Sequence, residues 1–326
     1  KDSRADLLLD WYFDRGPAVG TELGWKNDTG SGGLFGYLVP NDYGRDLLVT
    51  GAKKDFGGET RGMITGEHRA ALSDEWTLFL EGAYISDETF IDGYFEDQAK
   101  NRREFTNSIY LRRLKDNSAL TVLGKTTFNN FIANEYLLQA PGYTVDKEPE
   151  IGYTRLADDL LADHPGLLTY SSEYRLSQMR LRFPSVAPNE IGFLDAARAN
   201  SIFGVAPGQS IADGLRAQGY TQEPVTRFDT RHEVDMPLSA GPLNITPFVA
   251  ARFTGYNDDF EQFSPRADEA YRAWGSEGVT VATEVQHVDN SVESRLFDLH
   301  RMRHIIEPSL TVWHADTTVD RVDLPV

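Results

Sequence analysis

The sequence predicts an all-β fold of about a dozen antiparallel strands, joined by tight turns and a few long loops. Apolar and polar side chains alternate with a period of two in many segments, which sends them to opposite faces of a strand. Glycine is frequent, at 28 residues, and aromatic residues make up 11% of the chain, a combination typical of strands and turns. No segment approaches the roughly 18 apolar residues of a membrane-spanning helix, so a helical membrane protein is excluded.

Composition excludes several other classes of protein. The formal charge is −18, with both signs mixed along the chain and no basic stripe, so we expect no nucleic-acid partner. The chain has no cysteine, and therefore neither a disulfide framework nor a metal site built on cysteine. It begins without the pattern of a signal peptide, from which we expect a mature chain or a segment of a longer one.

The alternation starts at the amino-terminal end and recurs in order along the chain. In the first segment Leu7, Leu9 and Trp11 alternate with Asp6 and Asp10 before a turn. The clearest strands are predicted at residues 7–13, 76–81, 120–125, 227–236, 243–254, 279–286 and 301–313.

Residues 184–226 interrupt this rhythm. They contain Pro184, Pro188, Pro207 and several glycines, which predict a long loop excursion between two strands. We expect a short helix near 194–199 within it, and the excursion to fold back as a plug or cap.

The predicted strand at 227–236 carries a row of charges on one face. The members of this row are Arg227, Asp229, Arg231, Glu233 and Asp235, opposite the apolar Phe228, Val234 and Met236. Charges of mixed sign on one strand face need water or each other. A solvated outer face and the wall of a water-filled lumen both satisfy that need.

The segment at 301–313 also divides into two unlike rows. Ile306, Leu310 and Val312 point one way, whereas Glu307, Ser309 and Thr311 point the other. Three histidines cluster nearby, at positions 300, 304 and 314. Strand residues four apart lie about 13 Å from each other, so we expect no metal site there.

No catalytic motif is present in the chain. There is no G-x-S-x-G elbow and no phosphate-binding loop, and the adjacent acidic pairs at 158–159 and 258–259 are typical of solvated turns. We therefore expect no enzymatic activity and no bound cofactor. Alternation alone does not distinguish a membrane β-barrel from a soluble β-sandwich, since both have one apolar face per strand.

Four stretches resemble the outer-membrane lipopolysaccharide-assembly protein family LptD, also called organic solvent tolerance protein. They are YFDRG at 12–16 with ELGW at 22–25, ISDETF at 85–90, GPLNITPF at 241–248, and the segment 291–299 followed by RHIIEP at 303–308. They occur in the family's order across nearly the whole chain. The residues that carry the two strongest signatures are Gly241, Pro242, Pro247, Arg303, His304, Glu307 and Pro308.

The resemblance implies an antiparallel transmembrane β-barrel in the outer membrane of a Gram-negative bacterium. The family's periplasmic jellyroll is absent, and its barrel has more strands than this chain supplies. We therefore expect residues 1–326 to be a single region, the amino-terminal portion of a larger barrel. The final residues also lack the aromatic terminus that is general in bacterial barrels.

The resemblance implies that the protein inserts lipopolysaccharide into the outer leaflet through a polar lumen and a lateral seam. Its implied partners are lipopolysaccharide, outer-membrane lipids, a lipoprotein plug of the LptE type and periplasmic transport proteins. We expect the charged row at 227–235 and Glu307 to face the lumen, with divalent cations bridging to substrate. Pro17 and Pro40 are candidates for weakening the seam, because proline removes ladder hydrogen bonds, although ordinary turn positions also explain them. The alternatives are a soluble β-rich protein that binds or cleaves polysaccharide, and a generic porin.

Overall fold

The computed structural model describes residues 2–48, 50–101, 104–129, 131, 143–257 and 269–319. Fourteen strands of this part of the chain form one antiparallel sheet, and two further pairs of strands form small sheets of their own. The predicted all-β antiparallel class is confirmed.

The strands of the first half precede the long excursion. They are β1 (Asp2–Tyr12), β2 (Gly16–Lys26), β3 (Gly30–Asp42), β4 (Arg45–Leu47), β5 (Lys53–Asp55), β6 (Glu59–Ala71), β7 (Trp76–Ile85), β8 (Asn107–Lys115), β9 (Ser118–Thr126), β10 (Thr144–Asp159) and β11 (Thr169–Arg182). The second half contains β12 (Val225–Asp235), β13 (Leu238–Ala240), β14 (Leu243–Tyr256), β15 (Tyr271–Thr283), β16 (Val285–Ser294), β17 (Leu299–Ile306) and β18 (Ser309–Thr317). The helices are α1 (Phe90–Tyr94), α2 (Glu96–Lys100), the 3-10 turn η2 (Pro188–Ile191), α3 (Ala196–Phe203) and α4 (Ile211–Ala217).

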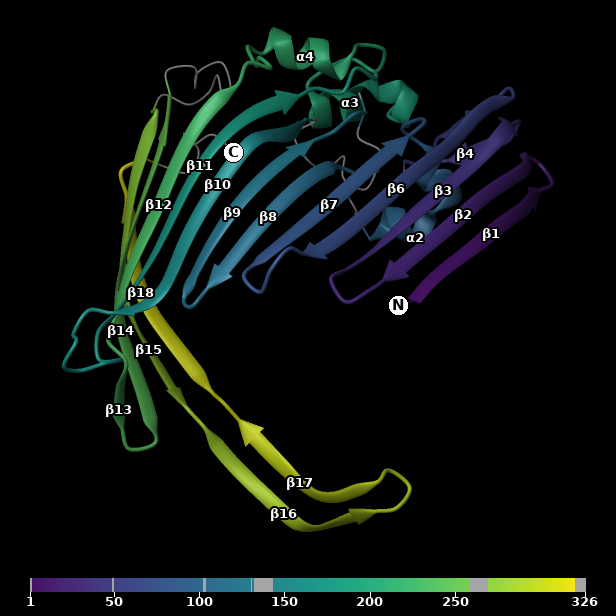
Figure 1. The fold of residues 1–326 in the computed structure, drawn as a ribbon. Helices are drawn as coiled ribbons and strands as arrows, with labels where there is room; N and C mark the ends of the chain where they lie inside the picture. The colour runs from purple at the N-terminus through teal and green to yellow at the C-terminus, as the bar shows by residue number, and fades with distance from the viewer. Residues whose placement is uncertain are drawn as a thin grey trace.

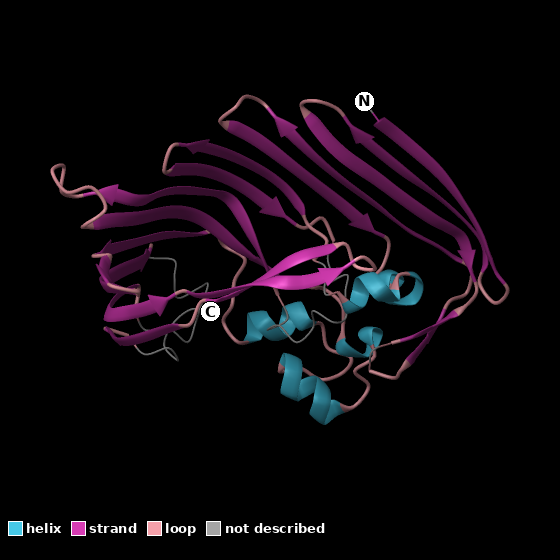
Figure 2. Ribbon diagram, turned by 90° about the horizontal axis from the view of Figure 1, so that it is seen from below, coloured by secondary structure: helices cyan, strands magenta, loops and turns pink. Residues whose placement is uncertain are grey.

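Neighbours in the large sheet follow one another in the order β1-β2-β3-β6-β7-β8-β9-β10-β11-β12-β14-β15-β18, with β13 paired to β14. The sheet is strongly curved, and its helices lie on the concave side (Figure 2). In the described part of the chain, β1 and β18 are edges and do not pair with each other. The arrangement is therefore an open, curved sheet, which is compatible with a partial barrel.

The two ends of the sheet differ in the length of their connections. At one end β2 joins β3, β6 joins β7 and β8 joins β9 through short turns (Figure 1). The turns have local causes. The Asn27 side chain accepts hydrogen bonds from the amides of Thr29 (3.0 Å) and Gly30 (2.8 Å), and Asp116 takes a positive φ of 49°. At the other end the connections 43–58, 86–106 and 183–224 are long and carry all the described helices.

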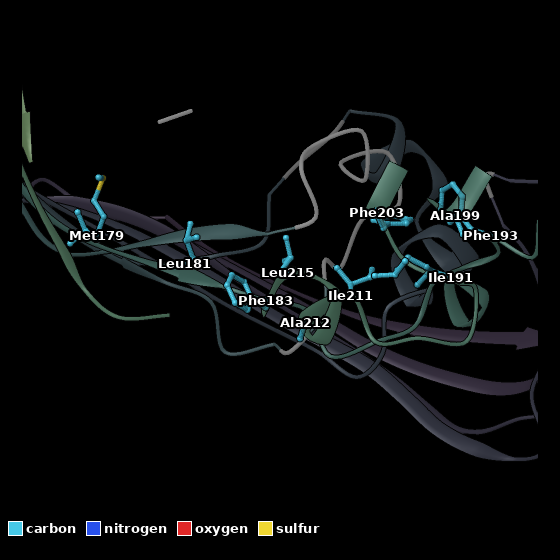
Figure 3. Close-up of a cluster of buried hydrophobic side chains, with 12 residues drawn as sticks. Met179, Leu181, Phe183, Ile191, Phe193, Ala199, Phe203, Ile211, Ala212 and Leu215 are labelled. Carbon is cyan, nitrogen blue, oxygen red and sulfur yellow. The ribbon is translucent and has the colours of Figure 1, made fainter. Parts of the chain in front are cut away.

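The excursion between β11 and β12 folds into a small apolar cluster against the sheet (Figure 3). Leu181 on β11 and Val225 on β12 are buried together with residues of the excursion, among them Ile191, Phe203 and Ile211. The helix α3 is capped at its start by Asp195, whose carboxylate accepts a hydrogen bond from the amide of Arg198, and at its end by Gly204 in the left-handed conformation. The predicted helix at 194–199 therefore exists but lies about half a turn later, and α4 was not predicted.

The predicted continuous strand at 301–313 is wrong in one respect. Glu307 and Pro308 belong to no strand and separate β17 from β18. Pro308 has no amide hydrogen for the ladder, and it contributes only its carbonyl, which accepts from Thr283 at 3.2 Å. Beyond this break β16 and β17 pair only with each other and project from the short-turn end as an exposed ribbon (Figure 1).

Candidate functional site

The sheet has two chemically different faces, and we define them from β1. Leu7, Leu9 and Trp11 are 67–73% exposed, and the ladder register places them on the face opposite Tyr37 and Met63. Because those two residues pack with Phe90 of α1, and the helices lie on the concave side, the exposed residues are on the convex face, which we call the outer face. Exposed apolar residues continue on this face across the sheet: Val19, Leu38, Ile64, Leu80, Tyr84, Ile109, Ile151, Leu176, Phe228, Val249, Phe253, Leu310 and Val312. An exposed apolar surface of this extent, interrupted by Glu277 of β15, marks contact with a membrane or another protein.

The opposite, inner face carries the charged row predicted on β12. The register places the row opposite Phe228, whose side chain lies on the outer face. Asp229, the second member of the row, is 7% exposed. Its carboxylate accepts hydrogen bonds from Arg252 (2.9 Å), Arg227 (3.0 Å) and Thr254 (2.7 Å). Arg231 pairs with Glu233 on the same strand.

Charged residues of both signs are tolerated on this face because the arginines and carboxylates of β12 and β14 neutralise one another. Asp235 ends the row at the short-turn end of β12. Glu307 does not join the row, because it lies in the break between β17 and β18, outside the 14-stranded sheet. That Glu307 faces a lumen stays a prediction.

The two prolines considered for a seam do not lie on the edge strands. Pro17 pairs with Trp11 near the turn that joins β1 and β2. Pro40 lies at an irregularity of β3, where the register with β6 shifts between Val39 and Asp42. Pro17 therefore lies on the strand that pairs with the edge strand β1, whereas Pro40 lies two strands from that edge, and a seam-weakening role of either residue stays a prediction.

The signature residues lie at the short-turn end. Gly241 has a φ of +62° and makes the turn between β13 and β14 with Pro242, and Pro247 follows on β14. Arg303 and His304 lie on β17 in the exposed ribbon. His314 lies on β18, in a different sheet from His300 and His304, and no group of three potential metal ligands occurs among the described residues.

A second polar cluster lies at the long-loop end and was not predicted. Arg61 on β6 is 2% exposed, and its guanidinium donates to Asp42 (2.6 Å), Asp46 (2.8 Å) and Asp87 (2.8 and 2.9 Å). Arg15 adds a second guanidinium, which donates to Asp46 at 2.6 Å and to Asp42 at 3.2 Å. We call these five residues the arginine clamp.

The arginine clamp joins segments that are distant in sequence. Asp42 ends β3, Asp46 lies on β4, and Asp87 precedes α1, so one side chain fixes both long loops to β6. Aromatic rings enclose the cluster: the Phe56 ring lies 3.7 Å from the Arg61 guanidinium carbon. Arg61 donates to all three carboxylates and Arg15 to two of them, so the cluster is a structural network rather than an acid–base pair.

The pKa of Asp87 reflects the electrostatics of the arginine clamp. Burial alone would raise the pKa of this carboxyl group. The hydrogen bonds and charge of Arg61, with smaller contributions from Ser86 and Thr89, outweigh burial and hold the pKa of Asp87 below its usual range.

Sequence reasoning missed the arginine clamp for a physical reason. The three aspartates occupy two loops without a shared spacing, and only the fold brings them to Arg61. One signal was available: Arg61, Met63 and Thr65 alternate with Gly62 and Ile64, a pattern that would place the arginine beside Met63 on one face of a strand.

The outer face has two shallow apolar depressions over β2, β3, β6 and β7, with volumes of about 520 and 550 Å³. Leu38, Ile64 and Tyr84 contribute side chains to their walls. The depressions form because four positions on the outer face are glycines and carry no side chain. These glycines are Gly36, Gly62, Gly66 and Gly82.

Aromatic side chains are divided between the faces. Trp11 and Tyr84 lie on the outer face near the long-loop end, and Trp25 lies on the same face near the short turns. Tyr256 instead packs against the cluster of the excursion, and Trp313 points to the inner face of β18. Three of these five aromatic side chains thus lie on the outer face.

Comparison with known proteins adds little to this description. No protein-family model and no curated protein matches the chain. Among solved structures, a bacterial polysaccharide outer membrane secretin aligns over 94% of this chain and 93% of its own, with 10% identity and a TM-score of 0.32. BamA from Haemophilus ducreyi lacking POTRA domains 1-3 aligns over 97% of this chain and 70% of its own, with 11% identity and a TM-score of 0.34. Among the described helices, none is long and apolar enough to cross a membrane.

Proposed function

We propose that this chain is part of an outer-membrane β-barrel that inserts lipopolysaccharide into the outer leaflet, in the manner of the LptD family that it resembles. The observation that carries the proposal is the division of the sheet into an apolar outer face and a charged inner face. An acyl chain needs apolar surroundings, whereas the sugars of the same molecule need water or polar groups. A sheet of this kind offers both media across the thickness of one strand.

The asymmetry of the connections supports an orientation within this proposal. Outer-membrane barrels have short periplasmic turns and longer extracellular loops. The short-turn end then faces the periplasm, with the ribbon of β16 and β17, and the helices face the outside. A lipoprotein plug and periplasmic transport proteins are the partners implied by the resemblance, and the ribbon is the part of the described chain that extends farthest toward them.

Two experiments test the proposal. A membrane β-barrel refolded in detergent should migrate faster on a gel before heating than after it, and full solubility of the chain without detergent would contradict membrane insertion. Depletion of the protein from its host should remove lipopolysaccharide from the cell surface. A generic porin would leave surface lipopolysaccharide unchanged when depleted, and that result would refute the transport role while leaving the membrane location intact.

A further inference from the structure

Three arginines on adjacent strands surround a small cleft on the inner face. Arg231 on β12, Arg252 on β14 and Arg272 on β15 line a space of about 150 Å³, together with Thr254 and Trp274. The register places Arg231 opposite Arg252 and Arg252 opposite Trp274, while Thr254 faces Arg272. Like charges directly opposite each other destabilise a sheet, so this arrangement has a cost in the empty protein.

The carboxylates that pair with these arginines do not neutralise the positive charge of the cleft. Asp229 serves both Arg227 and Arg252, and Glu233 serves Arg231. The guanidinium of Arg272 donates to the Thr317 hydroxyl at 2.8 Å, and none of the described carboxylates lies within 4.0 Å of it. Glu173 on β11 lies opposite Arg231 in the ladder, but the described ion pairs of Arg227, Arg231 and Arg252 are made with Asp229 and Glu233. The four arginines of β12, β14 and β15 therefore share two carboxylates by direct ion pairing, in a chain whose formal charge is −18.

We propose that this cleft binds the phosphate group of a phosphorylated sugar. Guanidinium groups present paired donors that match phosphate oxygens, and Arg272 has donors to spare. Trp274 supplies an aromatic face beside them, on which the apolar face of a sugar ring packs. Because ligand pockets for whole small molecules begin at about 300 Å³, the cleft accommodates a headgroup rather than a complete glycolipid.

The site deepens the proposed function, on which it rests only for the identity of the glycolipid that carries the phosphate. It identifies the inner face of β12, β14 and β15 as a place where a phosphorylated headgroup binds. Binding itself is a property of the isolated chain and needs no transport to be observed.

Titration calorimetry of the full chain in non-ionic detergent tests the inference, with glucose 6-phosphate, inorganic phosphate and glucose as probes. We expect glucose 6-phosphate to bind, inorganic phosphate to bind about tenfold more weakly, and glucose to give no heat. Added salt should weaken both phosphate probes, because the contacts are ionic. Absence of heat with glucose 6-phosphate would overturn the inference and leave the surface-lipopolysaccharide experiment as an independent test of transport.

Variants separate the parts of the cleft. Arg272→Gln should weaken glucose 6-phosphate about tenfold or more, and it leaves no carboxylate without its partner. Trp274→Leu should weaken the sugar phosphate but not inorganic phosphate. Arg69→Gln, on the inner face of β6, is the matched control and should bind as the unchanged protein does. Equal binding by the folded Arg272→Gln variant, or an unchanged preference for the sugar phosphate in Trp274→Leu, would contradict the assignment.

Discussion

At the scale of single residues, Arg61 decides how the long loops are held against the sheet. Its charge is buried with those of Asp42, Asp46 and Asp87, and burial of an ion is tolerated only while its partners remain. The cluster therefore stabilises the fold only while all of its members are present, because removal of one leaves the others as unpaired buried charges.

Replacement of Arg61 by methionine should destabilise the chain by about 3–5 kcal/mol, because three carboxylates lose their common partner. Guanidinium unfolding of the detergent-refolded protein, followed by tryptophan fluorescence, measures this change. Arg69→Met on the same strand and face is the control, since Arg69 is exposed and its loss should cost less than about 0.5 kcal/mol. Equal effects of the two variants would show that the arginine clamp contributes nothing specific.

The depressed pKa of Asp87 predicts a dependence of stability on pH. A carboxyl group whose pKa is lowered by folding contributes stability above its unfolded value, near 4, and loses it as pH falls through the folded value. The difference in unfolding free energy between the unchanged protein and Asp87→Asn should stay constant from about pH 7 to pH 5 and shrink below about pH 4. A difference that grows toward low pH would refute the assigned sign.

At the scale of elements, the excursion between β11 and β12 behaves as a small folded unit on a larger sheet. Its cluster contains residues of both strands, so its local stability depends on contacts with the sheet. Local units of this kind open without global unfolding.

Ile211→Ala should open the excursion selectively, because Ile211 is 1% exposed within the cluster and its truncation costs about 2–5 kcal/mol. A loss of about 2 kcal/mol corresponds to roughly thirtyfold faster tryptic cleavage at Arg198 or Arg216 when opening is rapid. Leu194→Ala, at an exposed position of the same excursion, should leave the cleavage rate unchanged. Cleavage within β11 or β12 at the same rate would instead indicate global unfolding.

The strands also show how much of the fold could be predicted from the sequence. Strands such as β12 and β14 were predictable, because each has one apolar and one polar face and the alternation records it. The register of the charged row followed from the same pattern. The separation of β17 from β18 did not follow, because the alternation of apolar and polar residues does not reveal the amide donor that Pro308 lacks. Clusters that join distant strands, such as the arginine clamp and the cleft beside Trp274, depend on pairings that one sequence does not specify.

At the scale of the whole molecule, a charge introduced on the outer face has a different cost in lipid and in water. Val249 lies at the middle of β14 and is 60% exposed. An arginine there is tolerated in water, where exposed substitutions change stability by about 0.5 kcal/mol or less, but costs about 2–4 kcal/mol at the centre of a bilayer. The same sheet therefore gives opposite expectations in the two media.

Val249→Arg should reduce the yield of heat-resistant, fast-migrating protein refolded into lipid vesicles. Thr121→Arg is the control, because Thr121 lies near the middle of β9 on the inner face, over Gly152. We expect this variant to refold like the unchanged chain. A Val249→Arg variant that refolds equally well would place the outer face in water and overturn the membrane assignment.

The glycines beneath the outer depressions have a mechanical consequence. A Cβ atom added at Gly36 or Gly82 would find its nearest neighbour at 3.8 or 3.7 Å, so close packing does not require glycine at either position. Glycine in a strand costs about 0.5–1 kcal/mol relative to alanine, and it removes the cross-strand contacts that stiffen a sheet. The sector formed by β3, β6 and β7 therefore has fewer cross-strand side-chain contacts at these positions, and it begins two strands from the edge at β1. We expect a displacement of β1 to bend the sheet along this row of glycines.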